Sequence, residues 1–204
     1  MSDKVKNFIE EKLKSTGREG IDKLIEYLEK SDFFIAPAST KYHGCYEGGL
    51  AEHSVNVMDA ILKVDDMLNK EYGVPKESEE SLILVSLLHD ICKVNTYFPK
   101  TLWRKDENGK WESYEGYERN PIFEMGHASK SVFIIQNYIK LTPQEAQAIY
   151  WHMGPYDLSA YSTANEMGEA YTKNTLAFKL NMADMMSTYI LENDTIKWEE
   201  QVNS

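Results

Sequence analysis

Histidine and aspartate side chains are the groups in this sequence best suited to chemistry. The chain contains five histidines, at positions 43, 53, 89, 127 and 152. His53 and His89 each fall on an apolar helical stripe, so we expect both imidazoles to point into the core. Taken alone, either residue is more simply explained as a hydrogen-bonded core histidine.

Two aspartates change this interpretation, because a buried carboxylate is costly unless a cation or hydrogen bonds compensate its charge. Asp90 belongs to a segment that is apolar nearly all round, and Asp184 continues the stripe of Leu176 and Leu180. A single inward aspartate is compatible with a hydrogen-bond hub. Two of them, together with inward histidines, are better explained by a shared cation. Imidazole and carboxylate donors suit Mn, Fe, Ni, Co or Zn rather than Ca.

Helices are expected to position these residues along almost the whole chain. Apolar residues recur at helical spacing in the segments 5–13, 21–28, 50–73, 79–92, 127–139, 143–151 and 174–192. Thr142-Pro143-Gln144-Glu145 is typical of a capping box with proline at the first helical position. Glycine, proline, serine and threonine interrupt the helical period in segments 31–49 and 154–172, which we expect to be loops.

A different pattern occupies the segment between Asn95 and Asn120. The helical period disappears there, aromatic residues are interspersed with polar ones, and Asn108-Gly109 is a tight-turn signal. The sequence therefore predicts an all-α helical bundle with a small β-hairpin insertion near residues 96–118. We expect a single domain over residues 1–204. Its parts would be N-terminal helices in 1–30, a core of about 33–190 and a charged tail in 193–204.

Composition favours a globular protein with a small ligand. The 204 residues are 42% hydrophobic and 27% charged, with only 6 prolines and 11 glycines, which excludes disordered, collagenous and disulfide-framed classes. The formal net charge of −11 opposes broad, sequence-independent binding to nucleic acid or to an anionic membrane. We therefore expect neither an extended nucleic-acid partner nor a membrane partner.

The sequence also predicts a cytoplasmic location. Its longest near-continuous apolar run, residues 82–88, is far shorter than the roughly 20 residues that span a bilayer. The N-terminal residues carry scattered charges and no apolar block, so they do not form a secretory signal. Cys45 and Cys92 are expected to be free thiols, because cytosolic chains of this size keep cysteines reduced.

With these residues in view, the sequence resembles the HD-domain superfamily of metal-dependent phosphohydrolases. Two blocks carry the resemblance, at residues 42–54 (YHGCYEGGLAEHS) and 87–93 (LLHDICK), and they are similar to blocks of bacterial HD hydrolases, including the HD domain of a 3′-5′ exoribonuclease family. Gly126-His127 and the residues 151–154 (WHMG) resemble two later histidine blocks of that subgroup. The resemblance covers roughly residues 33–190 and implies an all-α HD fold.

The resemblance implies a ligand set for two divalent metal ions. In the order His, His-Asp, His, His, Asp, the implied ligands are His53, His89, Asp90, His127, His152 and Asp184. Asp90 would bridge the two ions, while His127 and His152 would bind the second one. The alternative is that these two histidines contact substrate beside a single ion. Some relatives have a doubled histidine where this chain has His152-Met153, so the second ion is expected to bind more weakly or to need another ligand.

Other residues are candidates for substrate contacts. Lys93 follows the His-Asp pair and, by resemblance, reaches a phosphate oxygen or protonates a leaving group; the alternative is an exposed lysine at a helix C-terminus. Tyr42 and His43 are expected to line the pocket, unless they only shape their loop. Arg104 is expected to hold an anionic substrate while an aromatic side chain stacks on a base, although a solvated hairpin explains this segment more simply.

The resemblance implies an enzyme that hydrolyses a nucleotide or another small phosphoester with a metal-activated water. Asp90 and Lys93 are the expected catalytic residues. Two alternatives remain open: a diiron HD-type oxygenase with the same ligand order, and a non-catalytic nucleotide-binding HD domain. The intact ligand set argues against the second, because inward histidines and aspartates are costly to bury without a cation. The sequence leaves open the identity of the substrate and of the metal, and whether the chain forms a homo-oligomer.

Overall fold

Helices build most of this protein. The structure is a computed structural model that describes residues 3–157 and 164–192. Within these residues the α-helices are α1 (Asp3–Ser15), α2 (Ile21–Lys30), α3 (Gly49–Tyr72), α4 (Glu79–Leu88), α5 (His127–Gln136), α6 (Pro143–Trp151), α7 (Ala164–Lys173) and α8 (Thr175–Met186). Short 3-10 helices follow α4 (η1, Ile91–Lys93) and α6 (η2, Gly154–Asp157), and a π-helical turn follows α8 (η4, Ser187–Leu191). The predicted fold class is confirmed.

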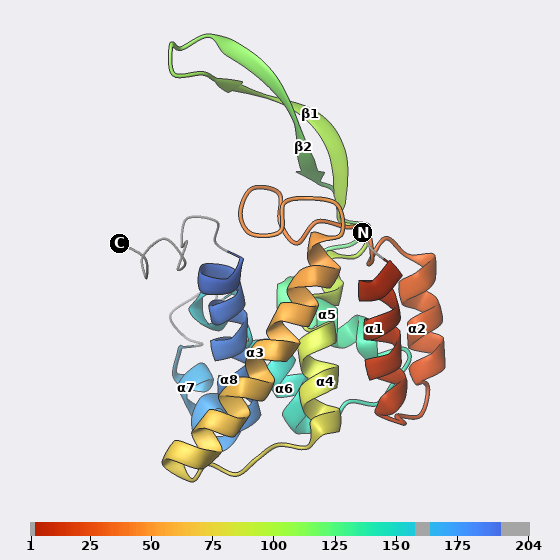
Figure 1. The fold of residues 1–204 in the computed structure, drawn as a ribbon, viewed down its shortest axis with the longest axis vertical. Helices are drawn as coiled ribbons and strands as arrows, with labels where there is room; N and C mark the ends of the chain where they lie inside the picture. The colour runs from red at the N-terminus through yellow and green to blue at the C-terminus, as the bar shows by residue number, and fades with distance from the viewer. Residues whose placement is uncertain (1–2, 158–163, 193–204) are drawn as a thin grey trace.

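The long helix α3 runs through the middle of the bundle. It packs against α4 on one side and α8 on the other, while α1 and α2 lie at the edge of the bundle (Figure 1). One cluster of buried apolar side chains extends from Ile9 in α1 to Ala183 in α8. Burial of these side chains supplies most of the drive to pack the helices together.

Local signals set several helix ends as the sequence predicts. The Thr142 hydroxyl accepts a hydrogen bond from the Glu145 backbone N–H, and the Glu145 carboxylate accepts one from the Thr142 backbone N–H, which completes the capping box. Gly73 ends α3 in the left-handed conformation, with φ of 68°. Ser78 caps α4 through the Ser81 backbone N–H.

A buried ion pair locks α8 against α3. Lys179 is fully buried, and its ammonium group donates to Asp65 Oδ1 at 2.8 Å, to the Pro75 carbonyl at 2.9 Å and to Glu77 Oε1 at 3.0 Å. Breaking one partner of such a pair leaves an uncompensated buried charge. The pair therefore fixes the relative position of the two helices that carry His53 and Asp184.

The predicted hairpin is present and projects from one end of the bundle (Figure 1). Strands β1 (Tyr97–Lys105) and β2 (Trp111–Arg119) pair antiparallel, from Tyr97 opposite Arg119 to Lys105 opposite Trp111. The connection spans residues 106–110. Within it, the Asp106 carboxylate accepts hydrogen bonds from the backbone N–H groups of Asn108 and Lys110. It is therefore longer than the tight turn expected at Asn108-Gly109.

Three predicted helix ends and one predicted loop were wrong, and one of these ends is that of α5, at Gln136 rather than near Ile139. Helix α4 ends at Leu88 rather than near Cys92, so His89 is its C-cap and Asp90 lies beyond it. The last α-helix ends at Met186 and continues only as a π-helical turn to Leu191. Helix α7 begins inside the segment 154–172 that was predicted to be a loop and ends at Lys173. Residues 158–163 of this segment fall outside the described residues.

The expected charged tail, residues 193–204, also lies outside the described residues. None of the helices within the described ranges combines the length and the apolar character needed to cross a bilayer. The limits of the expected single domain, and the cytoplasmic location, stay predictions.

Candidate metal centre

The six predicted ligands come together where helices begin and end. They lie on α3 (His53), at and just after the end of α4 (His89 and Asp90), at the start of α5 (His127), at the end of α6 (His152) and on α8 (Asp184). The first turn of α3 and the last turn of α4 both face the end of the bundle that carries the hairpin (Figure 1). Five of the six residues are buried, and His127 is partly exposed.

One half of the centre is formed by His53, His89 and Asp184. His53 Nε2 lies 3.2 Å from Asp184 Oδ1 and 3.3 Å from His89 Nε2. Asp90 Oδ2 also faces this half, at 3.7 Å from His53 Nε2 and 3.5 Å from His89 Nε2. Two imidazoles and two carboxylates therefore converge on one small volume.

The other half is formed around the second oxygen of Asp90. Asp90 Oδ1 lies 2.6 Å from His127 Nε2 and 3.5 Å from His152 Nε2. The rings of His127 and His152 are 5.3 Å apart. Because its two oxygens face different sets of imidazoles, Asp90 stands between the halves, as a bridging carboxylate would.

Three of the histidines are oriented by their outer nitrogens. His89 Nδ1 contacts the Ser86 carbonyl at 2.7 Å, and His152 Nδ1 contacts the Ile149 carbonyl at 2.6 Å. His53 Nδ1 contacts both oxygens of Glu192, at 2.9 and 3.1 Å. A carbonyl or carboxylate can only accept, so each Nδ1 carries the proton. In neutral imidazole this leaves Nε2 as the lone-pair nitrogen, which points into the centre.

Charges inside the centre strongly perturb its pKa values. Burial opposes protonation of His53, yet Asp184 and Glu192 outweigh it and raise its pKa to about 9. Burial lowers the pKa of His89 to about 3. Burial also opposes protonation of His127, but Cys92 and Asp90 raise its pKa to about 10. Although burial opposes ionisation of Asp90, the neighbouring Lys93 and imidazoles hold its pKa well below the usual range.

The donor set fits a divalent transition metal. His152 Nε2 is buried and has no hydrogen-bond partner among the described residues, although buried nitrogens are normally paired. Each of the trios His53–His89–Asp184 and His89–Asp90–His152 has ligand atoms within 4.8 Å of one another. Imidazole and carboxylate donors at this spacing, with outer nitrogens already oriented, suit Mn, Fe, Ni, Co or Zn.

Lys93 points into the centre instead of toward solvent. It lies in η1, is 8% exposed, and its Nζ is 2.6 Å from Asp90 Oδ2. Burial opposes its charge, but the Asp90 carboxylate raises the pKa of Lys93 above its ordinary value. Lys93 is therefore a fixed buried cation, and the structure contradicts the alternative of an exposed lysine at the end of a helix.

The loop before α3 brings His43 to the rim of the centre. The His43 ring lies 4.8 Å from the His53 ring, and both of its nitrogens are buried without a partner among the described residues. Close backbone contacts hold this loop: a Cβ on Gly49 would lie 2.1 Å from the Gly44 carbonyl oxygen, so only glycine fits there. Burial and the charge of His53 lower the pKa of His43, which keeps its imidazole neutral.

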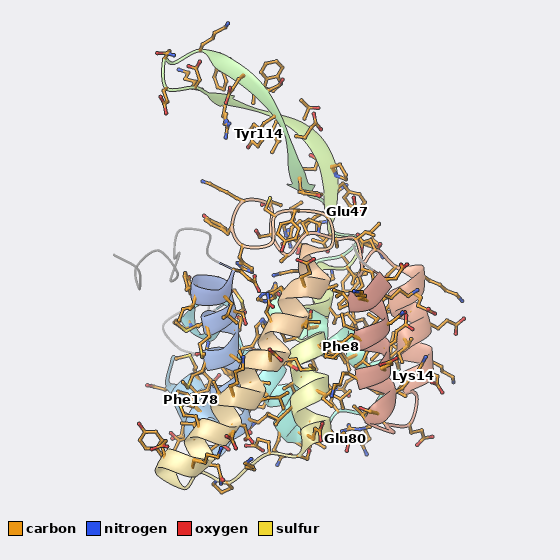
Figure 2. All side chains as sticks on the ribbon, viewed as in Figure 1. Phe8, Lys14, Glu47, Glu80, Tyr114 and Phe178 are labelled. Atoms are coloured by element: carbon orange, nitrogen blue, oxygen red, sulfur yellow. The ribbon has the colours of Figure 1, made fainter. Side chains whose placement is uncertain are left out.

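The other two predicted substrate contacts are exposed. Tyr42 is 76% exposed, in the same loop as His43. Arg104 is on the projecting hairpin, where it donates to Glu112 and lies over the ring of Tyr114, a residue that Figure 2 places on the hairpin, beyond the helices. Roles for Tyr42 and Arg104 in substrate binding stay predictions.

Two residues of the centre were not predicted from the sequence. Glu192, in the turn after η4, binds His53 Nδ1 and accepts a hydrogen bond from Asn56 Nδ2 at 2.9 Å. Its position at the charged C-terminal end of a predicted helix gave no signal that it turns inward. Cys92 Sγ lies 3.4 Å from His127 Nδ1. Because Cys92 belongs to no paired cysteine motif, the sequence predicts only a free thiol there. The structure confirms the free thiol.

Comparisons with known proteins identify the family of this chain. The family described as HD domain matches residues 50–185, which is more than half of the chain. The chain is also 36% identical over 97 residues to the Dihydroneopterin 2',3'-cyclic phosphate phosphodiesterase of Methanocaldococcus jannaschii. That match covers 48% of this chain and 34% of the relative, so the chain spans about a third of the length of this curated relative. No solved structure gives a significant match.

Glu192 is expected to position His53 for metal binding. Replacing Glu192 by alanine removes the acceptor of the His53 Nδ1 proton, so we expect metal affinity to fall by about 10–100-fold, the usual effect of losing such an outer partner. Chelator competition measures this affinity. Glu52→Ala is the matched control. Glu52 lies on α3, next to His53 in the sequence, and its carboxylate accepts a hydrogen bond from the Tyr46 hydroxyl and not from a histidine. Unchanged affinity in Glu192→Ala would contradict this role.

Metal binding is expected to release protons at pH 7. With pKa values of about 9 and about 10, His53 and His127 are protonated at that pH in the metal-free protein. A ligating nitrogen must be unprotonated, so binding displaces at least two protons and apparent affinity rises as the pH increases toward 9. Calorimetric titration in two buffers of different ionisation enthalpy counts the protons. The count should drop by one in His127→Gln, and release of no proton by the unmodified chain would refute the assignment.

Proposed function

The chain belongs to the HD domain family, and we propose that it is a metal-dependent phosphohydrolase acting on a small phosphoester. The observation that carries this proposal is the position of Asp90, a buried carboxylate whose two oxygens face two separate groups of imidazoles. Such a carboxylate is suited to bridging two divalent ions. When bound, these ions supply a water of lowered pKa and neutralise charge on phosphoryl oxygens.

The proposed ligands divide between the two halves of the centre. His53, His89 and Asp184 serve one ion, His127 and His152 serve the other, and Asp90 is shared. The hydrogen bonds at Nδ1 of His53, His89 and His152 hold their rings in place before any ligand arrives. Pre-oriented ligands lower the cost of assembling the site, which is the role of outer hydrogen bonds in metal centres.

Lys93 has an electrostatic role in this proposal. Its ammonium group is buried beside Asp90 and stays charged, because its pKa is raised. A fixed cation at this point binds a phosphate oxygen and stabilises the negative charge that grows in the transition state. The raised pKa makes Lys93 a poor proton donor near neutral pH, so we assign it charge stabilisation and not protonation of the leaving group.

His43 supplies a neutral imidazole at the rim of the centre. Neither of its nitrogens has a partner among the described residues, and its ring lies beside that of His53, tilted by 41°. We assign it a contact to the substrate, which places the substrate beneath the loop before α3.

The substrate class proposed is a phosphodiester of nucleotide size. The similar archaeal protein is named for hydrolysis of a 2',3'-cyclic phosphate, which is a small cyclic phosphodiester. The net charge of −11 disfavours long nucleic acids, whose phosphates would be repelled over much of the surface. Small cyclic and linear phosphodiesters are therefore the first compounds to test.

The test combines metal analysis with turnover. Chain freed of metal and reloaded separately with Mn, Co, Zn or Fe is assayed against an aryl phosphodiester, a nucleoside 2',3'-cyclic phosphate and a nucleoside monophosphate. We expect about two ions per chain and hydrolysis that a chelator abolishes. Asp90→Ala should lose both ions and all turnover, because it removes the shared ligand.

Other outcomes would overturn this proposal. If Asp90→Ala keeps two ions and full turnover, the site assignment is wrong. If the iron-loaded chain consumes oxygen and hydrolyses none of the three compounds, the diiron oxygenase alternative takes its place. If no ion binds under any condition, the non-catalytic alternative does.

Lys93→Met tests charge stabilisation separately from metal binding. We expect kcat to fall by at least about 100-fold while both ions are retained, since loss of one transition-state charge contact has effects of this order. Lys63→Met is the control, because Lys63 pairs with Asp59 on the exposed face of α3. A kcat within about threefold of the unmodified chain, with metal content intact, would exclude a role in the transition state.

A further inference from the structure

Cys92 lies in the wall of the centre, on the side of His127. It is 4% exposed, and its Sγ is 3.4 Å from His127 Nδ1 and 3.6 Å from His127 Nε2. Its backbone N–H donates to Ser131 Oγ at 3.2 Å, which ties η1 to α5. The sulfur is therefore held in a fixed position beside an imidazole of the proposed second ion.

The ligand atoms around this sulfur form a compact set. Those of Asp90, Cys92 and His127 lie within 4.8 Å of one another. A second observation points to a metal ion in this half. His152 Nε2 is fully buried and lacks a hydrogen-bond partner among the described residues. It lies 3.5 Å from the same Asp90 oxygen that contacts His127. Cys92, His127 and His152 thus all have a ligand atom close to Asp90.

We propose that Cys92 is a thiolate ligand of the second metal ion, together with Asp90, His127 and His152. This inference rests on the proposed function, since it needs an ion in that half. On binding, the Cys92 S–H bond breaks, its proton passes to solvent, and a sulfur–metal bond forms with no change of oxidation state. Some relatives have a second histidine where this chain has Met153. In this chain Cys92 would supply the additional ligand that the second ion was expected to need.

The proposed set makes the two halves chemically different. The first half offers imidazoles and carboxylates, whereas the second adds a soft sulfur donor. Thiolate ligands favour Zn²⁺ and other thiophilic ions over Mn²⁺, and imidazole, carboxylate and thiolate are all donors that Zn²⁺ binds in proteins. We therefore expect the second half to select Zn²⁺ or Co²⁺ over Mn²⁺.

Cobalt provides a direct test, because a bond between a thiolate and Co²⁺ gives a charge-transfer absorption band in the near ultraviolet. The full chain is freed of metal and titrated with Co²⁺, and the same is done with Cys45→Ser and Cys92→Ser. The chain has 2 cysteines, so Cys45→Ser is a matched control that leaves Cys92 as the single thiol. We expect the band in the unmodified chain and in Cys45→Ser, and none in Cys92→Ser.

Metal affinity gives a second readout. Cys92→Ser should bind its second Co²⁺ at least about tenfold more weakly, with the first ion unaffected, because only one half loses a ligand. If Cys92→Ser fails to fold by circular dichroism, the band in Cys45→Ser still assigns the thiolate.

Each contrary result has a distinct meaning. Two bound Co²⁺ ions without the band would overturn the assignment of Cys92 and leave the proposed hydrolase intact. A band that persists in Cys92→Ser would overturn it as well. Absence of any Co²⁺ binding would overturn the proposed function together with this inference.

Discussion

A buried carboxylate shared between two sets of imidazoles is the constraint on which this structure depends. Asp90 is 2% exposed and lies within 4 Å of Lys93 and of four histidines. An uncompensated carboxylate in such a place would be very costly, so its neighbours must be cationic, or must hold a cation between them. The arrangement of the helix ends follows from this requirement.

Helix ends, more than helix faces, form the centre. Because α4 stops at Leu88, Asp90 leaves the regular helical path directly after His89, and its two oxygens face different groups of imidazoles. His127 begins α5 and His152 ends α6, so both project from termini. The Lys179 ion pair then fixes α8 against α3 and keeps Asp184 opposite His53. A rigid bundle below the centre thus holds ligands that come from distant parts of the sequence.

Periodicity and residue chemistry predict much of the fold and of the centre. An inward His53 and Asp184 follow from their apolar helical stripes, and the hairpin follows from the loss of helical period. Where prediction failed, the deciding contacts are tertiary. Glu192 lies where the apolar helical pattern ends and charged residues begin. The packing of α8 on α3 brings its carboxylate to His53. Helix α7 was missed because its short sequence contains Gly168 and few large apolar residues.

The raised pKa values explain how one buried set of ligands tolerates both the presence and the absence of ions. In each half one imidazole, His53 or His127, holds a proton beside a carboxylate, so a positive charge is present where an ion would otherwise supply it. His89, which lacks this support, stays neutral at a pKa of about 3. Protons therefore compensate Asp90 and Asp184 in the metal-free fold. The hydrogen bonds at Nδ1 of His53, His89 and His152 hold these imidazoles in position to receive an ion.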